Sequence, residues 1–262
     1  MPTVRQIEEA LYALAPRELA MGWDNVGLLA GDPDREVTRV LVALDITQNV
    51  AEEAANAGAE LIVAHHPLMN CKWQPVQTLR EDTRLGKLLR TLVRKDISAI
   101  CMHTNLDIAA GGVNDVLANA LHLESPEPFG EEALLRVGTL KGGELPLERF
   151  LEQVTNGLRC HGLRYVNGGN SVCRVAVGGG SCGDSWREVL SAGCDTFVTA
   201  DVKYHDFLDA ALEGLNLIDA GHFETEDLVC ETVIQYLHGL FPELIIEKSS
   251  HQGVIHYYTE GE

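Results

Sequence analysis

Five side chains able to bind metal ions lie just after predicted strands of this sequence. Strand-like stretches at residues 61–64, 98–102 and 215–219 each run into polar residues with imidazoles or carboxylates. The candidate ligands are His65, His66, Asp107, His222 and Glu226. Such groups bind zinc, manganese, iron or nickel. One tetrahedral ion needs four ligands, so five, with carboxylates able to bridge, favour a site for two ions, which is typical of hydrolytic enzymes.

The adjacent histidines can serve two ions only where the chain leaves the regular strand. Neighbouring side chains of a strand point to opposite faces. At a strand end the backbone can turn, and His65 and His66 can then address two ions about 3.5–4 Å apart. The alternative is a polar loop in which one histidine caps a neighbouring group. Asp107 also has two interpretations, because aspartate near Gly111 and Gly112 commonly closes a turn.

His222 and Glu226 have the spacing of neighbours on a helix. A separation of four residues places both on one face of a helical turn. Glu224 competes for the carboxylate role, but a separation of two residues points it away from His222. The alternative is a solvated helix start, and the position directly after a buried strand favours metal binding.

Other polar residues also follow predicted strands, but their spacing matches no metal-binding pattern. Asp45 ends the first apolar strand, and Asp201, Lys203 and His205 follow a later one. They are either groups that orient ligands or contact a substrate, or surface residues at a helix start. The turn Gly178-Gly179-Gly180-Ser181 lacks the lysine and the spacing of nucleotide-binding loops. It either lets the backbone approach a ligand or forms a tight turn.

Predicted strands alternate with helices in the first half of the chain. Thr3 and Gln6 form a capping box that begins the first helix. The helix at 49–56 has Gly58 as its expected C-cap. The predicted strands are residues 40–44, 60–64 and 98–102. Largely apolar strands separated by helices are typical of a parallel sheet covered on both faces.

A stretch rich in Pro, Glu and Gly at residues 124–132 suggests a division of the chain. We expect one α/β lobe at residues 1–124, to which a C-terminal segment can return, and a second at 125–262. The second lobe has predicted strands at residues 172–177, 195–199, 215–219 and 243–247. The fold class is therefore α/β, with two similar lobes and mostly parallel sheets. Because ligands of open α/β sheets bind at the carboxyl ends of strands, the metal site is expected in the cleft between the lobes.

The composition limits the partners of the chain. The 262 residues carry a formal net charge of −19 at pH 7. Binding to nucleic acid rests on clustered Lys and Arg, so the charge argues against a nucleic-acid partner. A nucleotide substrate stays open, because bound divalent metals would bring positive charge to the site. The simpler interpretation of the acidity is solubility.

Cysteine usage predicts a reducing compartment. The seven cysteines are scattered singly and no CxxC occurs. Cys101, Cys173 and Cys230 lie within apolar runs, which predicts core thiols. We therefore expect a cytoplasmic protein without a disulfide framework. No apolar run approaches the length of a membrane span, and the N-terminal residues predict a helix instead of a signal peptide, so no membrane partner is expected.

Several of these motifs together resemble one known family. They are Trp23-Asp24-Asn25-Val26-Gly27-Leu28, Ala64-His65-His66-Pro67, His103-Thr104-Asn105-Leu106-Asp107, Thr199-Ala200-Asp201-Val202-Lys203-Tyr204-His205, and Asp219-Ala220-Gly221-His222 with Glu226. The family is that of the dinuclear metal centre hexameric proteins, also called Nif-three-like, whose bacterial members are named GTP cyclohydrolase I type 2 homologues. The resemblance extends from about Val4 to Tyr258, with the motifs in the same order and spacing, and the length is similar to that of the short family members.

The resemblance implies two α/β lobes, a cleft with two divalent ions and a toroidal homohexamer. By motif position, His65, His66, Asp107 and His222 would each hold one ion and Glu226 would bridge both. The family often has glycine where this chain has Ala200. A Cβ there would restrict the backbone if that glycine has a positive φ.

Two classes of function follow. The first is a metal-dependent hydrolase of the GTP cyclohydrolase type, which would open the guanine ring of GTP at C8 and release formate. His103, Asp201 or His205 would then transfer protons. A two-metal phosphoesterase is a second enzymatic alternative. The other class is a metal-binding hexamer without catalysis that stores or delivers ions or serves as a regulatory scaffold. The ligand set leaves zinc, manganese, iron and nickel open as the metal.

Overall fold

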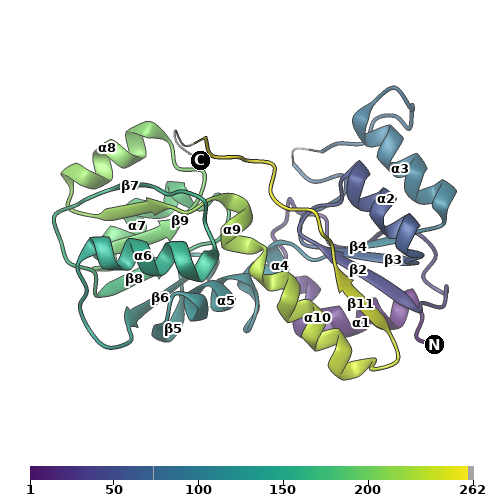
Figure 1. The fold of residues 1–262 in the computed structure, drawn as a ribbon, viewed down its shortest axis with the longest axis horizontal. Helices are drawn as coiled ribbons and strands as arrows, with labels where there is room; N and C mark the ends of the chain where they lie inside the picture. The colour runs from purple at the N-terminus through teal and green to yellow at the C-terminus, as the bar shows by residue number, and fades with distance from the viewer. Residues whose placement is uncertain (73, 259–262) are drawn as a thin grey trace. The chain divides into compact units, whose positions relative to one another are not determined.

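The computed structural model describes residues 1–72 and 74–258 and divides into two compact units (Figure 1). Unit 1 contains Met1–Gly112 and Val229–His251. Unit 2 contains Val113–Leu228 and the chain from Gln252 onward. The division expected at Glu124 differs from this boundary, because the stretch rich in Pro and Glu is no linker: Leu123–Phe129 is a strand of the second sheet. The later segment Val229–His251 belongs to unit 1.

Unit 1 is built on five strands and their covering helices. The strands are β1 (Gly27–Ala30), β2 (Arg39–Ala43), β3 (Leu61–Ala64), β4 (Ser98–Cys101) and β11 (Ile245–Lys248). The helices are α1 (Val4–Leu14), η1 (Arg17–Leu19), α2 (Gln48–Ala57), α3 (Arg84–Lys95), α4 (Thr104–Ile108) and α10 (Leu228–Leu240). The predicted capping box of Thr3 and Gln6 is present, and Gly58 ends α2 with a φ of 73°.

The sheet of unit 1 is mostly parallel, as predicted. The strand order is β1-β4-β3-β2-β11, and only β1 runs antiparallel to its neighbour. The strands are apolar at nearly every position because both faces are covered. Ile62 and its same-face neighbours pack with α2 and α3 through Val50 and Leu92. Figure 1 shows these two helices on one side of the sheet and α1 and α10 on the other.

Unit 2 has a six-stranded sheet and helices on both of its faces. The strands are β5 (Leu123–Phe129), β6 (Leu135–Leu140), β7 (Arg164–Val166), β8 (Arg174–Val177), β9 (Thr196–Thr199) and β10 (Asn216–Asp219). The helices are α5 (Val113–Ala120), α6 (Leu147–Leu158), η2 (Gly183–Ser185), α7 (Trp186–Ser191), α8 (Tyr204–Leu212) and α9 (His222–Glu226).

The second sheet differs from the expectation of mostly parallel pairing. Its order is β5-β6-β8-β9-β10-β7, in which β8, β9 and β10 are parallel and the three outer strands pair antiparallel. The three parallel strands are those predicted from apolar runs. The other three strands were not predicted. Their sequences are interrupted by prolines or arginines, or the strand is only three residues long.

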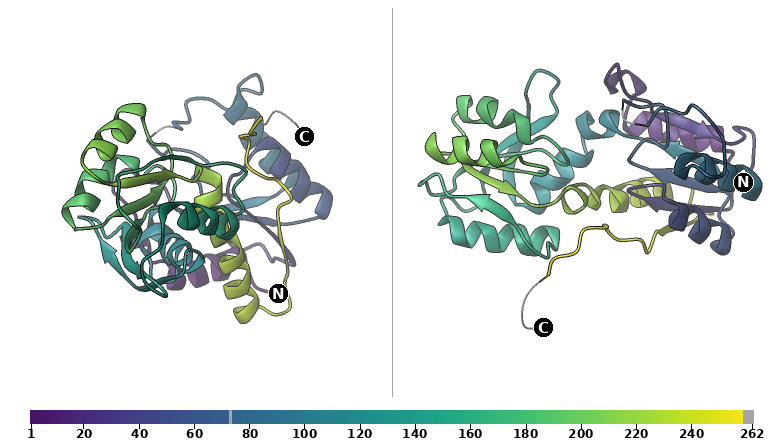
Figure 2. Two further views of the ribbon diagram at one scale, coloured as in Figure 1. Left: turned by 60° about the vertical axis from the view of Figure 1, so that its left-hand side comes forward. Right: turned by 90° about the horizontal axis from the view of Figure 1, so that it is seen from above.

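Strand alternation sends the side chains of this sheet into two separate cores. Val198 contributes to the core under α5 and α6, together with Phe150. Phe197, its neighbour on β9, contributes to the opposite core with Trp186 of α7. Figures 1 and 2 show α6 on one face of the sheet and α7 and α8 on the other.

The cysteines are unbridged, as expected, but they differ in burial. Cys101 and Cys230 are buried, which confirms the predicted core thiols, and burial raises the pKa of Cys101 to about 12. Cys173 is exposed, so its prediction as a core thiol was wrong. It precedes β8, whose buried positions begin two residues later, with Val175. In the described part of the chain, no helix combines the length and the apolar character that a membrane span requires.

Candidate metal centre

His65 and His66 lie directly after β3, and their backbone still forms hydrogen bonds with the chain at the end of β2. The His66 N–H donates to the Leu44 carbonyl at 2.9 Å. The His65 Nδ1 donates to the Met102 carbonyl, and the His66 Nδ1 donates to Asp45 Oδ1, both at 2.8 Å. Because both acceptors are oxygens, each Nδ1 carries the proton and each Nε2 keeps a lone pair for a metal ion.

Asp107 reaches the same region of unit 1 from the short helix α4. Its backbone N–H donates to the His103 carbonyl at 3.0 Å, which places Asp107 one helical turn after β4. The carboxylate is buried, and its Oδ1 lies 3.5 Å from His65 Nε2. The structure therefore brings Asp107 beside His65, another predicted ligand.

His103 forms a third imidazole of this cluster. His65, His66 and His103 each offer one ring nitrogen that could bind a metal ion, and these three atoms lie within 4.8 Å of one another. The His103 Nδ1 donates to Asp24 Oδ2 at 2.9 Å, so its Nε2 also keeps its lone pair. Three imidazoles with the same tautomer thus converge in unit 1.

Asp24 is a functional candidate that the spacing of the sequence did not reveal. Its Oδ2 accepts hydrogen bonds from His103, from the Thr104 backbone N–H at 3.0 Å and from the Thr104 hydroxyl at 2.6 Å. Burial acts to raise the pKa of this carboxyl, but the hydrogen bonds from His103 and Thr104 outweigh it and lower the pKa to about 2. An ionised Asp24 therefore holds His103 in place.

In unit 2, His222 and Glu226 lie on α9, and the expected helical turn is present. The His222 Nε2 lies 3.1 Å from Glu226 Oε2. The His222 Nδ1 donates to Asp201 Oδ2 at 2.7 Å, so an oxygen acceptor orients this imidazole as in unit 1. Glu224 instead places its carboxylate against Gly221. The helical spacing therefore predicted which of the two glutamates lies beside His222.

Asp201 contacts His222 because of an unusual backbone conformation. Its φ is +54°, whereas Ala200 is outside the left-handed region. The Cβ of Ala200 therefore imposes no backbone strain, and Asp201 orients His222. This position for Asp201 supports a positioning role for it.

The glycine-rich turn after β8 approaches the two ligands of unit 2. A Cβ at Gly180 would collide with Glu226 Oε1 and would come within 3.1 Å of His222 Nε2. The Gly180 N–H donates to the Thr225 hydroxyl at 3.0 Å, and the Gly179 N–H donates to Asn114 Oδ1 at 2.8 Å. The turn therefore lies against His222 and Glu226.

The residues present fit divalent ions. Every one of the four imidazoles binds an oxygen acceptor through Nδ1, which is the usual support for a metal-binding histidine. Buried carboxylates, Asp107 and Glu226, lie next to Nε2 atoms. Gly180 leaves room at Glu226 that any other residue would fill.

Two of the polar residues that follow β9 lie apart from these ligands. His205 is exposed in the first turn of α8, where its ring contacts that of Tyr204. Lys203 Nζ forms an exposed ion pair with Asp184 at 2.6 Å. Neither belongs to any group of potential metal ligands among the described residues.

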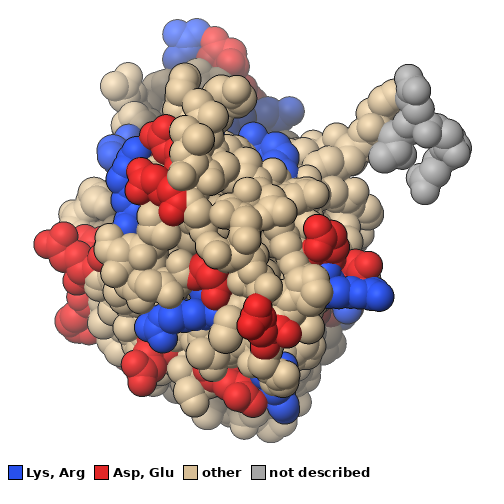
Figure 3. Space-filling model, turned by 90° about the vertical axis from the view of Figure 1, so that its left-hand side faces the viewer, with Lys and Arg blue, Asp and Glu red and all other residues tan. Residues whose placement is uncertain are grey.

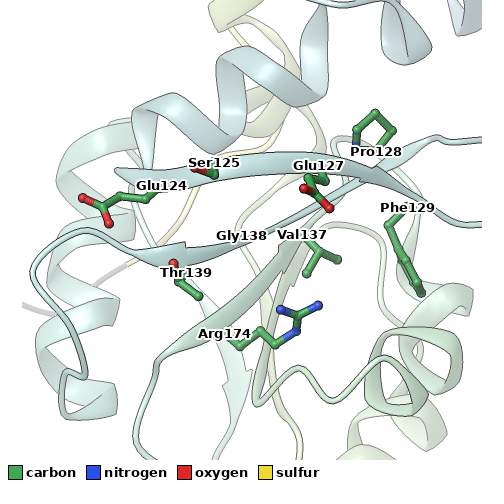
Figure 4. A pocket seen from close by; sticks show the side chains of 9 residues that line it. All are labelled: Glu124, Ser125, Glu127, Pro128, Phe129, Val137, Gly138, Thr139 and Arg174. Atoms are coloured by element: carbon green, nitrogen blue, oxygen red, sulfur yellow. The ribbon is translucent and has the colours of Figure 1, made fainter.

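A separate hollow of about 250 Å³ lies over β5, β6 and β8 of unit 2 (Figure 4). Figure 4 shows the carboxylates of Glu124 and Glu127 on one rim and the guanidinium of Arg174 opposite. The hollow forms where the pairing of β5 with β6 shifts register between Glu124 and Glu127. None of the predicted metal ligands lines it.

The fold and these residues define an α/β protein of two units whose imidazoles and carboxylates can hold metal ions. The model of the Duf34/NIF3 (NGG1p interacting factor 3) family matches residues 2–252, and the chain belongs to this family. The family resemblance expected from the motifs is thus confirmed.

Relatives of known name and structure agree with this assignment. The GTP cyclohydrolase 1 type 2 homolog of Streptomyces coelicolor is 37% identical over 243 residues, which cover 88% of this chain and 84% of the relative. The GTP cyclohydrolase 1 type 2 of Helicobacter pylori strain J99 is 31% identical over 241 residues, covering 91% and 93%. The crystal structure of the Staphylococcus aureus hypothetical protein SA1388 matches with a TM-score of 0.88 at 28% identity, covering 98% and 99% of the two chains.

Proposed function

We propose that this protein is a metal-dependent hydrolase that opens the guanine ring of GTP. Relatives that share most of their length with this chain are named GTP cyclohydrolase 1 type 2 or its homolog. The observation that carries the proposal is the gathering of imidazoles and buried carboxylates that could hold metal ions, in which an oxygen acceptor at Nδ1 orients each of the four imidazoles. A structural metal site surrounds one ion with four protein ligands, whereas a catalytic site leaves a position open for water or substrate. A set of this size and composition suits the catalytic kind better.

In this proposal His65, His66, Asp107, His222 and Glu226 would hold two divalent ions. The motifs that carry the family resemblance support this set, as does the hydrogen-bond support of its imidazoles. Bound ions would polarise the attacked ring carbon and make water a nucleophile near neutral pH. Zinc, manganese, iron and nickel all suit mixed imidazole and carboxylate ligands.

His103 is the residue best suited to move a proton in this reaction. Its Nδ1 is fixed on Asp24, so its Nε2 can accept a proton and return it. The Asp24 carboxylate would stabilise the imidazolium formed in between. His205 suits this task less well, because it lies exposed on α8. Asp201 holds His222 in orientation and is therefore a positioning residue.

Trp23 supports a purine as the substrate. Its indole is exposed, and its ring centroid lies 6.0 Å from that of His103 in an edge-to-face arrangement. An exposed aromatic face beside a proton-transfer group can stack on a base, an interaction worth about 1–3 kcal/mol per base. Water would add at C8 of the stacked guanine, and hydrolysis of the resulting formamide would release formate.

The test is a product analysis with metal-loaded protein. Protein reconstituted with manganese or zinc is incubated with GTP, and formate, inorganic phosphate and ring-opening absorbance are followed. We expect formate to appear with the absorbance change. Glu226→Gln should abolish formate release, whereas Glu224→Gln, its matched control on the same helix, should retain it.

The alternatives predict different products. Phosphate without formate would replace the proposal by a two-metal phosphoesterase. Metal bound in stoichiometric amounts, with neither product, would favour storage, delivery or a regulatory scaffold.

We also propose that the protein works as a homohexamer in the cytoplasm. The hexamer rests on the family resemblance of the sequence motifs. The cytoplasm rests on the seven unbridged thiols, which persist in a reducing compartment. Light scattering that gives a monomer at micromolar concentration would contradict the first of these statements.

A further inference from the structure

Helix α8 carries apolar side chains on two opposite sides. On its inner side, Ala210 is buried in the core that includes Trp186, and Phe207 packs against this core. On its outer side, Tyr204, Leu208 and Leu212 follow one another at intervals of four residues and are 75%, 45% and 78% exposed. A helix that is apolar on both sides is normally covered on both.

Helices α6 and α3 differ from α8 in the composition of their outer sides. In α6, also in unit 2, the exposed residues include Glu148, Arg149 and Glu152. In α3 of unit 1, Val93 is exposed among charged residues. Single exposed apolar residues are common, but a continuous row of three is typical of an interaction surface.

We propose that the outer row of α8, formed by Tyr204, Leu208 and Leu212, is a two-fold interface with a second copy of this chain. The proposal deepens the proposed homo-oligomer by assigning one of its contact surfaces, and it is independent of the metal chemistry. Residues four apart form a ridge on the surface of a helix, and packed helices contact each other through such ridges.

The sequence of α8 is complementary to itself in the antiparallel direction. With the two-fold axis at Leu208, this residue meets its own counterpart, and Tyr204 meets Leu212 of the copy. The same symmetry places Lys203, just before the helix, opposite Glu213 of the copy, just after it. Such reciprocal pairing is what an isologous interface requires.

Charge is the reason for choosing a second copy over an unrelated partner. Two chains with a formal charge of −19 each repel one another, so a contact between copies must be apolar or must pair opposite charges. The row of α8 does both. Lys203 also contacts Asp184 of its own chain, so its charge would be shared between two carboxylates. Figure 3 shows the side of the molecule that is on the left in Figure 1, where α8 lies, with wide uncharged areas between the charged groups.

The first test is the oligomeric state of Leu208→Asp by sedimentation and light scattering. A charge at the centre of the interface should raise the dissociation constant about 30-fold or more and release smaller species. Val93→Asp places the same charge on an exposed apolar residue of α3 and should leave the oligomer unchanged. Circular dichroism shows whether both variants are folded.

Two further variants test the antiparallel geometry. Lys203→Glu should weaken the assembly, and the double variant Lys203→Glu with Glu213→Lys should restore it. Leu208→Cys, made with Cys173→Ser to remove the exposed native thiol, should form a cross-linked dimer under mild oxidation. Val93→Cys in the same background should stay uncross-linked.

The outcomes separate this surface from the oligomer itself. If the wild type is a monomer, the homo-oligomer and this interface are both wrong. If Leu208→Asp keeps the wild-type assembly, or if Leu208→Cys fails to cross-link in an oligomeric protein, the oligomer stands and the α8 interface is wrong. If Leu208→Asp loses the assembly but the double variant Lys203→Glu with Glu213→Lys does not restore it to the Lys203→Glu protein, the antiparallel arrangement is wrong.

Discussion

At the residue scale, position separates one acidic candidate for a metal ligand from its neighbour. Glu226 and Glu224 are two residues apart on α9, yet only Glu226 places an oxygen beside His222 Nε2, at 3.1 Å. The other carboxylate lies against Gly221. The chain therefore contains its own control for the role of one acidic side chain.

We expect Glu226→Gln to bind manganese or zinc more weakly than Glu224→Gln does. The amide keeps the size of the side chain but removes the negative charge that a bridging group would place between two cations. Changes in residues that merely orient ligands typically cost about 10–100-fold in metal affinity, so loss of a direct ligand should cost at least that much. Isothermal titration of both variants measures the difference. Equal affinities would mean that Glu226 is not the ligand.

Asp24 should contribute stability that disappears in acid. Its pKa lies at about 2 in the folded protein, against 3.8 for the free group. A lowered pKa means that the ionised carboxyl stabilises the fold above pH 3.8 and loses this contribution as the pH falls towards 2. In metal-free protein, the stability difference between wild type and Asp24→Asn should therefore shrink over this range.

The measurement is the free energy of unfolding by urea, from neutral pH down to about pH 2. A difference that stays constant with pH would show that Asp24 titrates normally. Asp34, an exposed aspartate with a single ion pair to Arg5, gives the reference for an ordinary surface carboxyl when replaced in the same way.

At the scale of elements, the turn between β8 and η2 places backbone against the candidate ligands His222 and Glu226. Gly180 has a φ of +61°, and a Cβ there would collide with Glu226. Gly193, after α7, has a φ of +74° and open space around the same position. Both glycines avoid the backbone strain of the left-handed region, but only Gly180 is also required by a neighbouring side chain.

Gly180→Ala and Gly193→Ala should therefore differ in metal binding more than in backbone strain. Each should lose about 1–2 kcal/mol of stability from the left-handed backbone. Only Gly180→Ala should displace Glu226 and lower the metal affinity, by about 10-fold or more. Thermal unfolding and titration with manganese check the two effects. A normal metal affinity in Gly180→Ala would show that the turn can move away from Glu226.

The strands that could be predicted are those with uninterrupted apolar runs. The central strands of both sheets belong to this group, because burial on both faces excludes polar side chains. In β6, the buried Arg136 interrupts the apolar pattern, and it is satisfied by Asp115 of α5, a partner that local sequence cannot identify. In β5, Pro126 and Pro128 are tolerated because the strand lies at the edge of its sheet. This is why its sequence resembled a linker.

The sequence placed the candidate ligands after strands, because the carboxyl ends of parallel strands lie at one edge of a sheet. Their supporting groups were less so. Asp45 and Asp201 follow strands, and the sequence marked both as possible support. Asp24 contacts His103 across 79 positions of the chain, and Gly180 contacts a ligand from a different strand end. Contacts of this range depend on the tertiary fold, so no periodicity reveals them.

For the chain as a whole, the net charge bears on how metal binding must be tested. The formal net charge of −19 makes the chain attractive to cations in general. Acidic and basic groups are interspersed on the face in Figure 3, so the acidity there is spread out instead of forming one patch. Specific binding must therefore be distinguished from loose association by its stoichiometry and by its dependence on named ligands.

We expect about two divalent ions per chain after metal loading and extensive dialysis, because five ligands exceed the four that close a site for one ion. Elemental analysis measures the content. His66→Ala and His222→Ala should each lower it while the fold is retained, because both side chains lie outside the cores of their units. Replacing exposed His205 by Ala is the matched control and should leave the content unchanged. One ion or none in the wild type would contradict a dinuclear centre, whereas an equal loss in His205→Ala would mean that the ions are held by general surface charge.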